Sequence, residues 1–211
     1  MLEVGGGIGA IEIELLKAGV TSAVNVELTP TYEEAAGELL RETGLADRVE
    51  RRVLDFVETG ADVEAADFVV LNRVICCYPD MPRLTAAAAK RVRHTLVLTF
   101  PNSRWWTRLG LTIVNFGFRV VRVQFRVFLH RPELIQAAAE QYGLKTTLND
   151  QGLLWQVMAL DKAAQRKPSR PSRRSGLHNL GIWPPEVALT SNRGIFARKS
   201  PRFRSRTPPG Q

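Results

Sequence analysis

The sequence contains little cysteine and no long apolar run that is free of charge. Its only two cysteines, Cys76 and Cys77, are adjacent, and a bridge between neighbours would demand strained geometry. A disulfide framework is thereby excluded, and a reducing cytoplasm fits. The most apolar later stretch, residues 109–129, is broken by three arginines and is a poor membrane span. No basic segment with an apolar run follows Met1, so we expect a cytoplasmic protein without a signal peptide or a transmembrane segment.

Acidic residues are nearly absent from the last part of the chain. Residues 162–211 contain 12 Lys and Arg and a single acid, Glu186, for a net charge of +11, which leaves a net charge of −3 for residues 1–161. The overall charge of +8 is therefore a property of residues 162–211. This segment is rich in Arg, Ser and Pro and has too little apolar surface to offset the entropy of ordering it. We expect one domain at residues 1–161 and a disordered tail at 162–211, which is only solvated or contacts a polyanion nonspecifically.

Strand and helix patterns alternate along residues 1–161. The patterns predict strands at residues 2–4, 23–27, 49–56, 67–71 and 96–100, and helices at residues 8–16, 32–43 and 82–94. Further helices are expected at 105–121 and 132–142, followed by two strands near 144–148 and 153–160 that form a hairpin. This alternation predicts an α/β fold with a mostly parallel sheet and helices on both faces.

The most informative motif is Glu3-Val4-Gly5-Gly6-Gly7-Ile8-Gly9, a glycine-rich turn between a strand and a helix. Glycines permit unusual φ values and let a ligand approach the backbone, while the following helix presents unpaired N–H groups. The same residues satisfy the dinucleotide fingerprint, and they are also compatible with a simple tight turn. Glu3 favours a third interpretation, because a carboxylate close to the turn would repel a pyrophosphate but suits a ligand that carries an ammonium and a sulfonium.

The alternation of an acid with three glycines resembles the first motif of the class I S-adenosylmethionine-dependent methyltransferases. The resemblance implies a three-layer Rossmann-like fold, with a mostly parallel seven-stranded sheet and an antiparallel C-terminal hairpin strand. It also implies that S-adenosylmethionine is the cofactor. Glu3 would help to hold the methionine amino end, and the backbone of Gly5, Gly7 and Gly9 would lie beside the cofactor.

Further acids follow the next two expected strands. Glu27 ends the second strand, where a carboxylate can accept hydrogen bonds from ribose hydroxyls. A dehydrogenase would place an acid there too, and a solvated strand end is the alternative. Asp55 and Phe56 end the third strand, and in the resembled family such residues contact the adenine amino group and cover its ring. Asp55 could instead cap a helix. Asn72, at the end of the fourth strand, completes the predicted cofactor site, and we assign no metal site.

The methyl acceptor is expected to contact residues 72–80 and 104–130. Residues 72–80 lack the Asn-Pro-Pro-aromatic motif of the methyltransferases that modify base amines, so a nucleic-acid substrate is not expected. We predict transfer to a small molecule or metabolite. His130 is a candidate base, with Tyr78 and Asp80 as further candidates, although His130 could also be a hydrogen-bonded loop residue. Transfer from a sulfonium chiefly requires positioning of the acceptor, so a base is not strictly demanded.

Two alternatives stay open at this point. An NAD(P)-dependent oxidoreductase would use the same glycines and Glu27. A degraded methyltransferase fold would act as a binding module, through the tail or through the Trp105-Trp106 region with its arginines, which could touch a polyanion or a lipid surface. Members of the resembled family usually have a helix before the first strand, whereas Glu3 is the third residue here. We therefore expect that helix to be missing, with weaker cofactor binding and stability.

Overall fold

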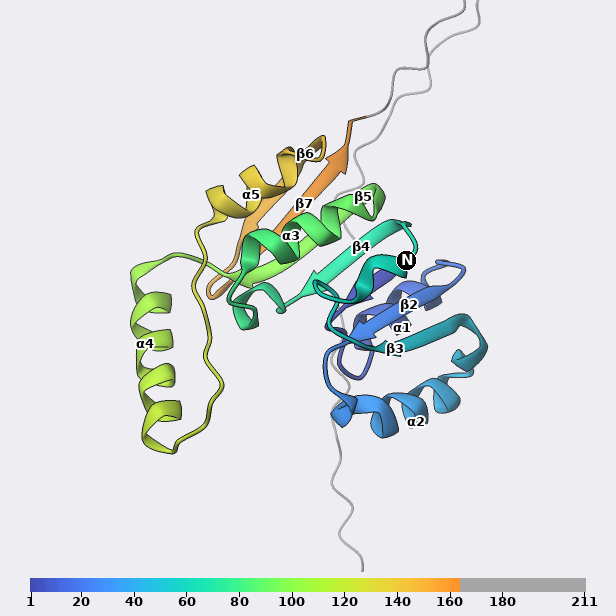
Figure 1. Cartoon of the computed structure of the whole chain (residues 1–211), viewed down its shortest axis with the longest axis horizontal. Helices are drawn as coiled ribbons and strands as arrows, with labels where there is room; N and C mark the ends of the chain where they lie inside the picture. Colours follow the sequence, from blue (N-terminus) through green and yellow to red (C-terminus); the bar gives the residue numbers. More distant parts are fainter. Residues whose placement is uncertain (164–211) are drawn as a thin grey trace, which may run out of the picture. The chain divides into compact units, whose positions relative to one another are not determined.

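The computed structural model describes residues 1–163, which form a seven-stranded sheet with helices on both faces (Figure 1). The strand order is β3-β2-β1-β4-β5-β7-β6, so the first strand lies inside the sheet. The strands are β1 (Leu2–Val4), β2 (Ala23–Glu27), β3 (Val49–Val53), β4 (Ala66–Asn72), β5 (Val92–Pro101), β6 (Leu144–Gln151) and β7 (Trp155–Lys162). This is the predicted three-layer Rossmann-like fold.

The sheet is parallel from β3 to β5, and β7 is antiparallel to both of its neighbours. The chain moves outward from β1 to β2 and β3, and then returns to the other side of β1 with β4. This reversal is a topological switch point, where α/β sheets bind their ligands beyond the carboxyl ends of the strands.

Five helices connect the strands. They are α1 (Ala10–Lys17), α2 (Glu33–Thr43), α3 (Met81–Lys90), α4 (Trp105–Val120) and α5 (Pro132–Glu140). Short 3-10 turns occupy Pro30–Tyr32, Ala46–Arg48, Gly60–Asp62 and Ile75–Cys77. Helices α3 and α5 lie side by side on one face of the sheet (Figure 1). Not one of the helices in residues 1–163 is long and apolar enough to cross a membrane.

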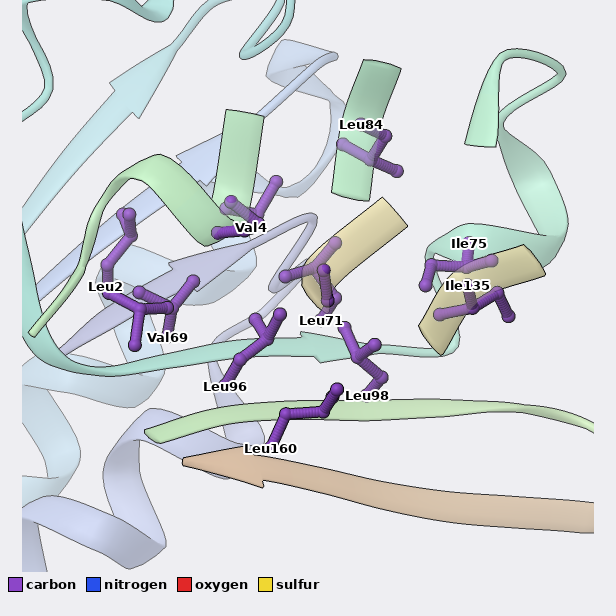
Figure 2. Close-up of a cluster of buried hydrophobic side chains, with 14 of the residues drawn as sticks. Leu2, Val4, Val69, Leu71, Ile75, Leu84, Leu96, Leu98, Ile135 and Leu160 are labelled. Atoms are coloured by element: carbon purple, nitrogen blue, oxygen red, sulfur yellow. The ribbon is translucent and has the colours of Figure 1, made fainter. Parts of the chain in front are cut away.

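The alternation of side chains along the strands divides the core into two parts. In β2, Val26 belongs to the large cluster that contains α3 and α5, whereas Ala23 packs with α1 and α2. Figure 2 shows the large cluster, in which Leu71, Leu98 and Leu160 from three adjacent strands are fully buried. Because the inner strands are covered on both faces, even the polar residues Glu3 in β1 and Asn25 in β2 are buried.

Several predicted boundaries were wrong. The third strand ends at Val53 and not at residue 56, because the Asp55 carboxylate accepts from the backbone N–H groups of Val57 and Glu58 and turns the chain. The helix expected at 82–94 ends at Lys90, and β5 already begins at Val92 because it pairs with β4 on one side and β7 on the other. The hairpin turn follows Gln151 and is shorter than expected, since β6 pairs along its whole length with β7.

The predicted tail falls mostly outside the described part of the chain. The proposed boundary after residue 161 lies within β7, which runs to Lys162. Residues 164–211, and with them the expected disorder of the tail, lie outside the described residues.

Candidate functional site

A cavity of about 480 Å³ opens at the carboxyl ends of β1, β2 and β4. This volume is within the range of pockets that hold cofactors and drug-sized ligands. Six of the eleven residues singled out from the sequence line the cavity, namely Gly5, Gly7, Glu27, Asp55, Phe56 and Tyr78. The switch point of the sheet therefore brings together residues that lie far apart in the sequence.

The glycine-rich turn forms one wall of the cavity with a backbone that only glycine adopts easily. Gly5, Gly7 and Gly9 have φ angles of +67°, +56° and +83°. A Cβ added to Gly5 would lie 2.6 Å from a methyl group of Val74, whereas a Cβ added to Gly7 would meet no atom within 4 Å. Gly7 thus faces the open cavity, and any side chain at this position would occupy ligand space.

Glu27 holds the glycine-rich turn in place from below the cavity. Its Oε2 accepts from the backbone N–H of Gly7 at 2.9 Å, and its Oε1 accepts from the N–H groups of Leu28 at 2.8 Å and Thr29 at 3.4 Å. A carboxylate offers about four acceptor positions, so one on Oε2 is left for a ligand hydroxyl. The solvated strand end considered for Glu27 is excluded, because only 7% of the residue is exposed.

Arg51 in β3 fixes the same turn from the opposite side. Its Nη2 donates to the carbonyl oxygen of Gly7 at 2.8 Å and to the Glu33 carboxylate at 2.8 Å. Gly7 is therefore bonded through both its N–H and its C=O, to two different strands. The turn is held in one conformation before any ligand binds, which lowers the entropic cost of binding.

Asp55 and Phe56 form the wall beyond β3. Asp55 uses Oδ1 to accept from the N–H groups of Val57 and Glu58, so it closes a turn and does not cap a helix as the alternative had it. Its Oδ2 accepts no hydrogen bond from residues 1–163 and is free for a donor such as an amino group. Phe56 is 5% exposed, and the guanidinium of Arg91 lies 5.0 Å above its ring.

Glu3 does not line the cavity. Its Oε2 accepts from the backbone N–H of Glu12 at 3.0 Å, and so caps the first turn of α1. Burial raises the pKa of Glu3 to about 8, and the neighbouring Glu12 carboxyl adds to the shift. Glu3 was expected to hold the methionine amino end directly or through water, and this role stays a prediction.

Glu3 belongs to a buried polar cluster beneath the glycine-rich turn, formed by Glu3, Glu12, Asn25 and Arg51. Glu12 is fully buried, and burial raises the pKa of its carboxyl. Arg51 Nη1 lies 3.7 Å from Glu12 Oε1 and partly compensates the buried charge. A Cβ on Gly9 would collide with the Glu12 carboxylate. Gly9 is thus required by this cluster, and it does not line the cavity.

The remaining candidates lie beside the cavity. Asn72 ends β4 next to the cavity without lining it. Asp80 accepts from the backbone N–H of Arg83 at 3.2 Å and caps α3. His130 lies 3.2 Å, through Nε2, from the carbonyl oxygen of Tyr78, so Nε2 donates and this nitrogen is not free to act as a base. Tyr78 lines the cavity, and burial raises the pKa of its hydroxyl.

Three lining residues that were not singled out individually lie in the two segments expected to contact the acceptor. Arg73 has a φ of +62°, a strained conformation for a residue other than glycine, and its guanidinium lies 4.5 Å from the centre of the Trp155 ring. Cys77 Sγ is 3.8 Å from Cys76 Sγ, and this hydrogen bond lowers the pKa of Cys77 to about 7. Phe125 reaches the cavity from the segment after α4. Arg73 and Cys77 lie in the first of these segments, just after a strand end, and Phe125 lies in the second.

The lining fits a nucleoside-containing ligand. Glu27 and Asp55 offer acceptors at separate points of the wall, and Leu28, Leu54 and Phe56 supply apolar surface between them. The open face of Gly7 lets such a ligand approach the backbone. Arg73 and Tyr78 come from the segment expected to face an acceptor, and Phe125 from the second such segment.

Comparison with known proteins finds similarity to methyltransferases. Residues 2–95 match the family model described as a methyltransferase domain. No curated protein gives a match. The chain is similar to the structure of magnesium protoporphyrin IX methyltransferase from Synechocystis PCC 6803 with bound SAH, with 16% identity, a TM-score of 0.59, and coverage of 77% of this chain and 73% of the other.

Two further solved structures have the same fold. Geranyl diphosphate C-methyltransferase from Streptomyces coelicolor A3(2) is 14% identical, with a TM-score of 0.61 and coverage of 77% of this chain and 70% of the other. An O-methyltransferase family protein from Burkholderia thailandensis is 17% identical, with a TM-score of 0.64 and coverage of 78% and 51%. At these identities the likeness concerns the fold alone.

Proposed function

We propose, from the premise that this chain belongs to the class I S-adenosylmethionine-dependent methyltransferase superfamily, that it transfers a methyl group to a small-molecule acceptor. The observation that carries the proposal is the cavity at the switch point, where the glycine-rich turn, Glu27 and Asp55 surround one space. Solved structures of the same fold include enzymes named for small substrates, such as geranyl diphosphate. The cytoplasmic location stays a prediction.

We assign the cofactor contacts to residues that line the cavity. The Oε2 atom of Glu27 would accept from a ribose hydroxyl, and Asp55 Oδ2 would accept from the adenine amino group. Phe56 and Leu54 would cover the two sides of the base, and the backbone of Gly7 would lie beside the methionine portion. Glu3 would act indirectly, because it accepts from α1 and belongs to the buried polar cluster that supports the glycine-rich turn.

The bound cofactor would supply the methyl group on a positively charged sulfur, which is the reactive part of the chemistry. The protein's part is to hold an acceptor in line with it and to exclude water, which can lower a barrier by several kcal/mol. Arg73, Cys77, Tyr78 and Phe125 form the part of the wall where the acceptor would lie. Among them Cys77 lies beside Cys76, and the hydrogen bond between the two sulfur atoms lowers the pKa of the Cys77 thiol.

The test is calorimetric titration of the full chain with S-adenosylmethionine and S-adenosylhomocysteine, with NAD as a competing ligand. We expect the first two to bind and NAD to give no heat. Binding of NAD alone would establish the oxidoreductase instead. If the folded protein gives no heat with any of the three ligands, the chain has a degraded fold that no longer binds the cofactor.

A matched pair of variants locates the site. Gly7→Arg places a long side chain in the cavity, whereas Gly44→Arg places the same side chain at the end of α2. The φ angles of the two glycines are similar, +56° and +67°, and neither has an atom within 4 Å of an added Cβ. Both variants have the same backbone strain, so their stabilities should be similar. We expect Gly7→Arg to abolish binding and Gly44→Arg to keep it. Equal binding by both variants would exclude this cavity as the cofactor site.

A further inference from the structure

Helix α4 and the segment that returns from it, residues 121–128, form an arm that contributes little to the core. Within α4 only Thr107 is buried. The helix stands clear of the sheet and its covering helices (Figure 1). A helix with so little buried surface is unusual in a folded domain, because most helical stability comes from packing one apolar face.

The exposed side of α4 is apolar. Its apolar stripe consists of side chains spaced by three or four residues, which lie on one face of a helix. Each of them is between 54% and 70% exposed, and they are Trp105, Leu109, Ile113, Phe116 and Val120. Five large apolar side chains in one exposed row mark a surface that binds a partner.

The arm also carries positive charge without any acid. Six arginines occur at residues 104–131, four of them within the arm itself, and no Asp or Glu occurs there. Arg108 and Arg119 lie along one border of the apolar stripe, by their positions on the helix. Among the salt bridges of residues 1–163, only Arg131 of these six takes part, with Glu133 at 3.6 Å.

The arm is held in a defined position. The Trp106 indole donates to the carbonyl oxygen of Leu153 at 3.0 Å, which ties the start of α4 to the β6–β7 hairpin. Asn115 donates to the carbonyl of Val127 at 2.8 Å and accepts from its N–H at 2.9 Å, which joins the helix to the returning segment. The apolar stripe is therefore exposed in an ordered arm and is not a product of fraying.

We propose that the arm docks on an anionic lipid surface, with the apolar stripe in the headgroup region and the arginines against acidic headgroups. An amphipathic helix with Trp, Phe and Leu on one face and Arg beside them is typical of helices that lie in a membrane interface. At 16 residues, α4 is about 24 Å long and too short to span a bilayer, so it would lie in the plane. The absence of acids favours a negatively charged partner.

Docking would place the cavity next to the lipid. Phe125, in the returning segment, lines the cavity, and Phe128 donates its N–H to the carbonyl of Cys76 at 2.7 Å, beside Cys77. An acceptor dissolved in the lipid would then reach the cavity without crossing water. This consequence rests on the proposed methyl transfer, whereas docking itself does not.

The experiment is flotation of the full chain, without cofactor, on phosphatidylcholine vesicles that contain one third phosphatidylglycerol. The matched variants are Ile113→Glu, on the apolar stripe, and Val114→Glu, on the other side of the same helix and 43% exposed. They add the same charge to neighbouring β-branched positions and leave residues 162–211 unchanged. Thermal unfolding checks that both variants stay folded.

We expect the wild type to float with the anionic vesicles and to be released by salt. Ile113→Glu should weaken the partition about tenfold or more, since an apolar side chain that docking would bury in the lipid is replaced by a charge. Val114→Glu should behave as the wild type, and Arg119→Ala should weaken the partition about fivefold.

Two results would overturn docking through the arm. One is equal flotation of Ile113→Glu and Val114→Glu, which would assign lipid binding to charge elsewhere in the chain. The other is failure of the wild type to float while light scattering shows a dimer that Ile113→Glu dissociates, which would assign the apolar stripe to a second copy. Neither result depends on cofactor binding, so both are separate from failure of the proposed function.

Discussion

Replacement of Glu3 by glutamine should change how the stability of the protein depends on pH. Glutamine has the same shape, and its amide oxygen can still accept the Glu12 N–H that Glu3 accepts at 3.0 Å. What the variant removes is the ionisation of a buried carboxyl. Because burial raises the pKa of Glu3 from 4.5 to about 8, the folded protein keeps a proton there that the unfolded chain releases.

The sign and the size follow from this difference in proton binding. Below about pH 4.5 the carboxyl is protonated in both states, so its full contribution to stability is present. Between about pH 4.5 and about pH 8 only the unfolded chain ionises, and the free energy of unfolding falls by about 1.4 kcal/mol per pH unit from this group. Above about pH 8 the loss is complete and amounts to about 5 kcal/mol. Glu3→Gln lacks this loss.

Urea unfolding at a series of pH values measures the effect. The free energy of unfolding of Glu3→Gln should rise above that of the wild type as the pH increases, and the difference should level off near pH 8. Glu14→Gln, at an exposed position of helix α1, is the control and should keep the pH dependence of the wild type. Parallel curves for Glu3→Gln and the wild type would refute the reasoning.

Three further predictions concern residues whose roles the structure defines. Asp80→Ala should lower the free energy of unfolding by about 1 kcal/mol, because it removes the cap of α3. It should leave the turnover rate of methyl transfer unchanged. A large loss of that rate with stability intact would instead identify Asp80 as a catalytic residue. Asn102→Ala should lower the free energy of unfolding by about 3 kcal/mol, measured by thermal unfolding. The Asn102 amide is fully buried, donates to the carbonyls of Gly152 and Leu153, and accepts from Thr107. A change below 1 kcal/mol, about the value of one hydrogen bond, would contradict this prediction. Leu98→Ala should cost about 2 to 5 kcal/mol in urea unfolding, because it opens a cavity in the middle of the sheet, and an unchanged midpoint would be the contrary result.

The sequence by itself determined the fold class and the chemistry of the cavity. The β-strand 23–27 was predicted with its observed bounds, since Val24 and Val26 alternate with Asn25 and Glu27 and a Thr-Pro pair follows. The glycines with positive φ were marked by their own residue type, because no other residue adopts that backbone at low cost. Glu27 and Asp55 were found because carboxylates at strand ends are a local feature of the chain.

Only the tertiary structure decided what each of these side chains contacts. Glu3 precedes the glycine-rich turn, yet it caps α1, because the following residues fold back over it. Arg51 had no local signal, and its bond to Gly7 arises from the parallel pairing of β2 and β3. Phe125 enters the cavity because α4 reverses the chain toward it. Burial and pairing depend on residues that are distant in the chain, so neither composition nor periodicity can specify them.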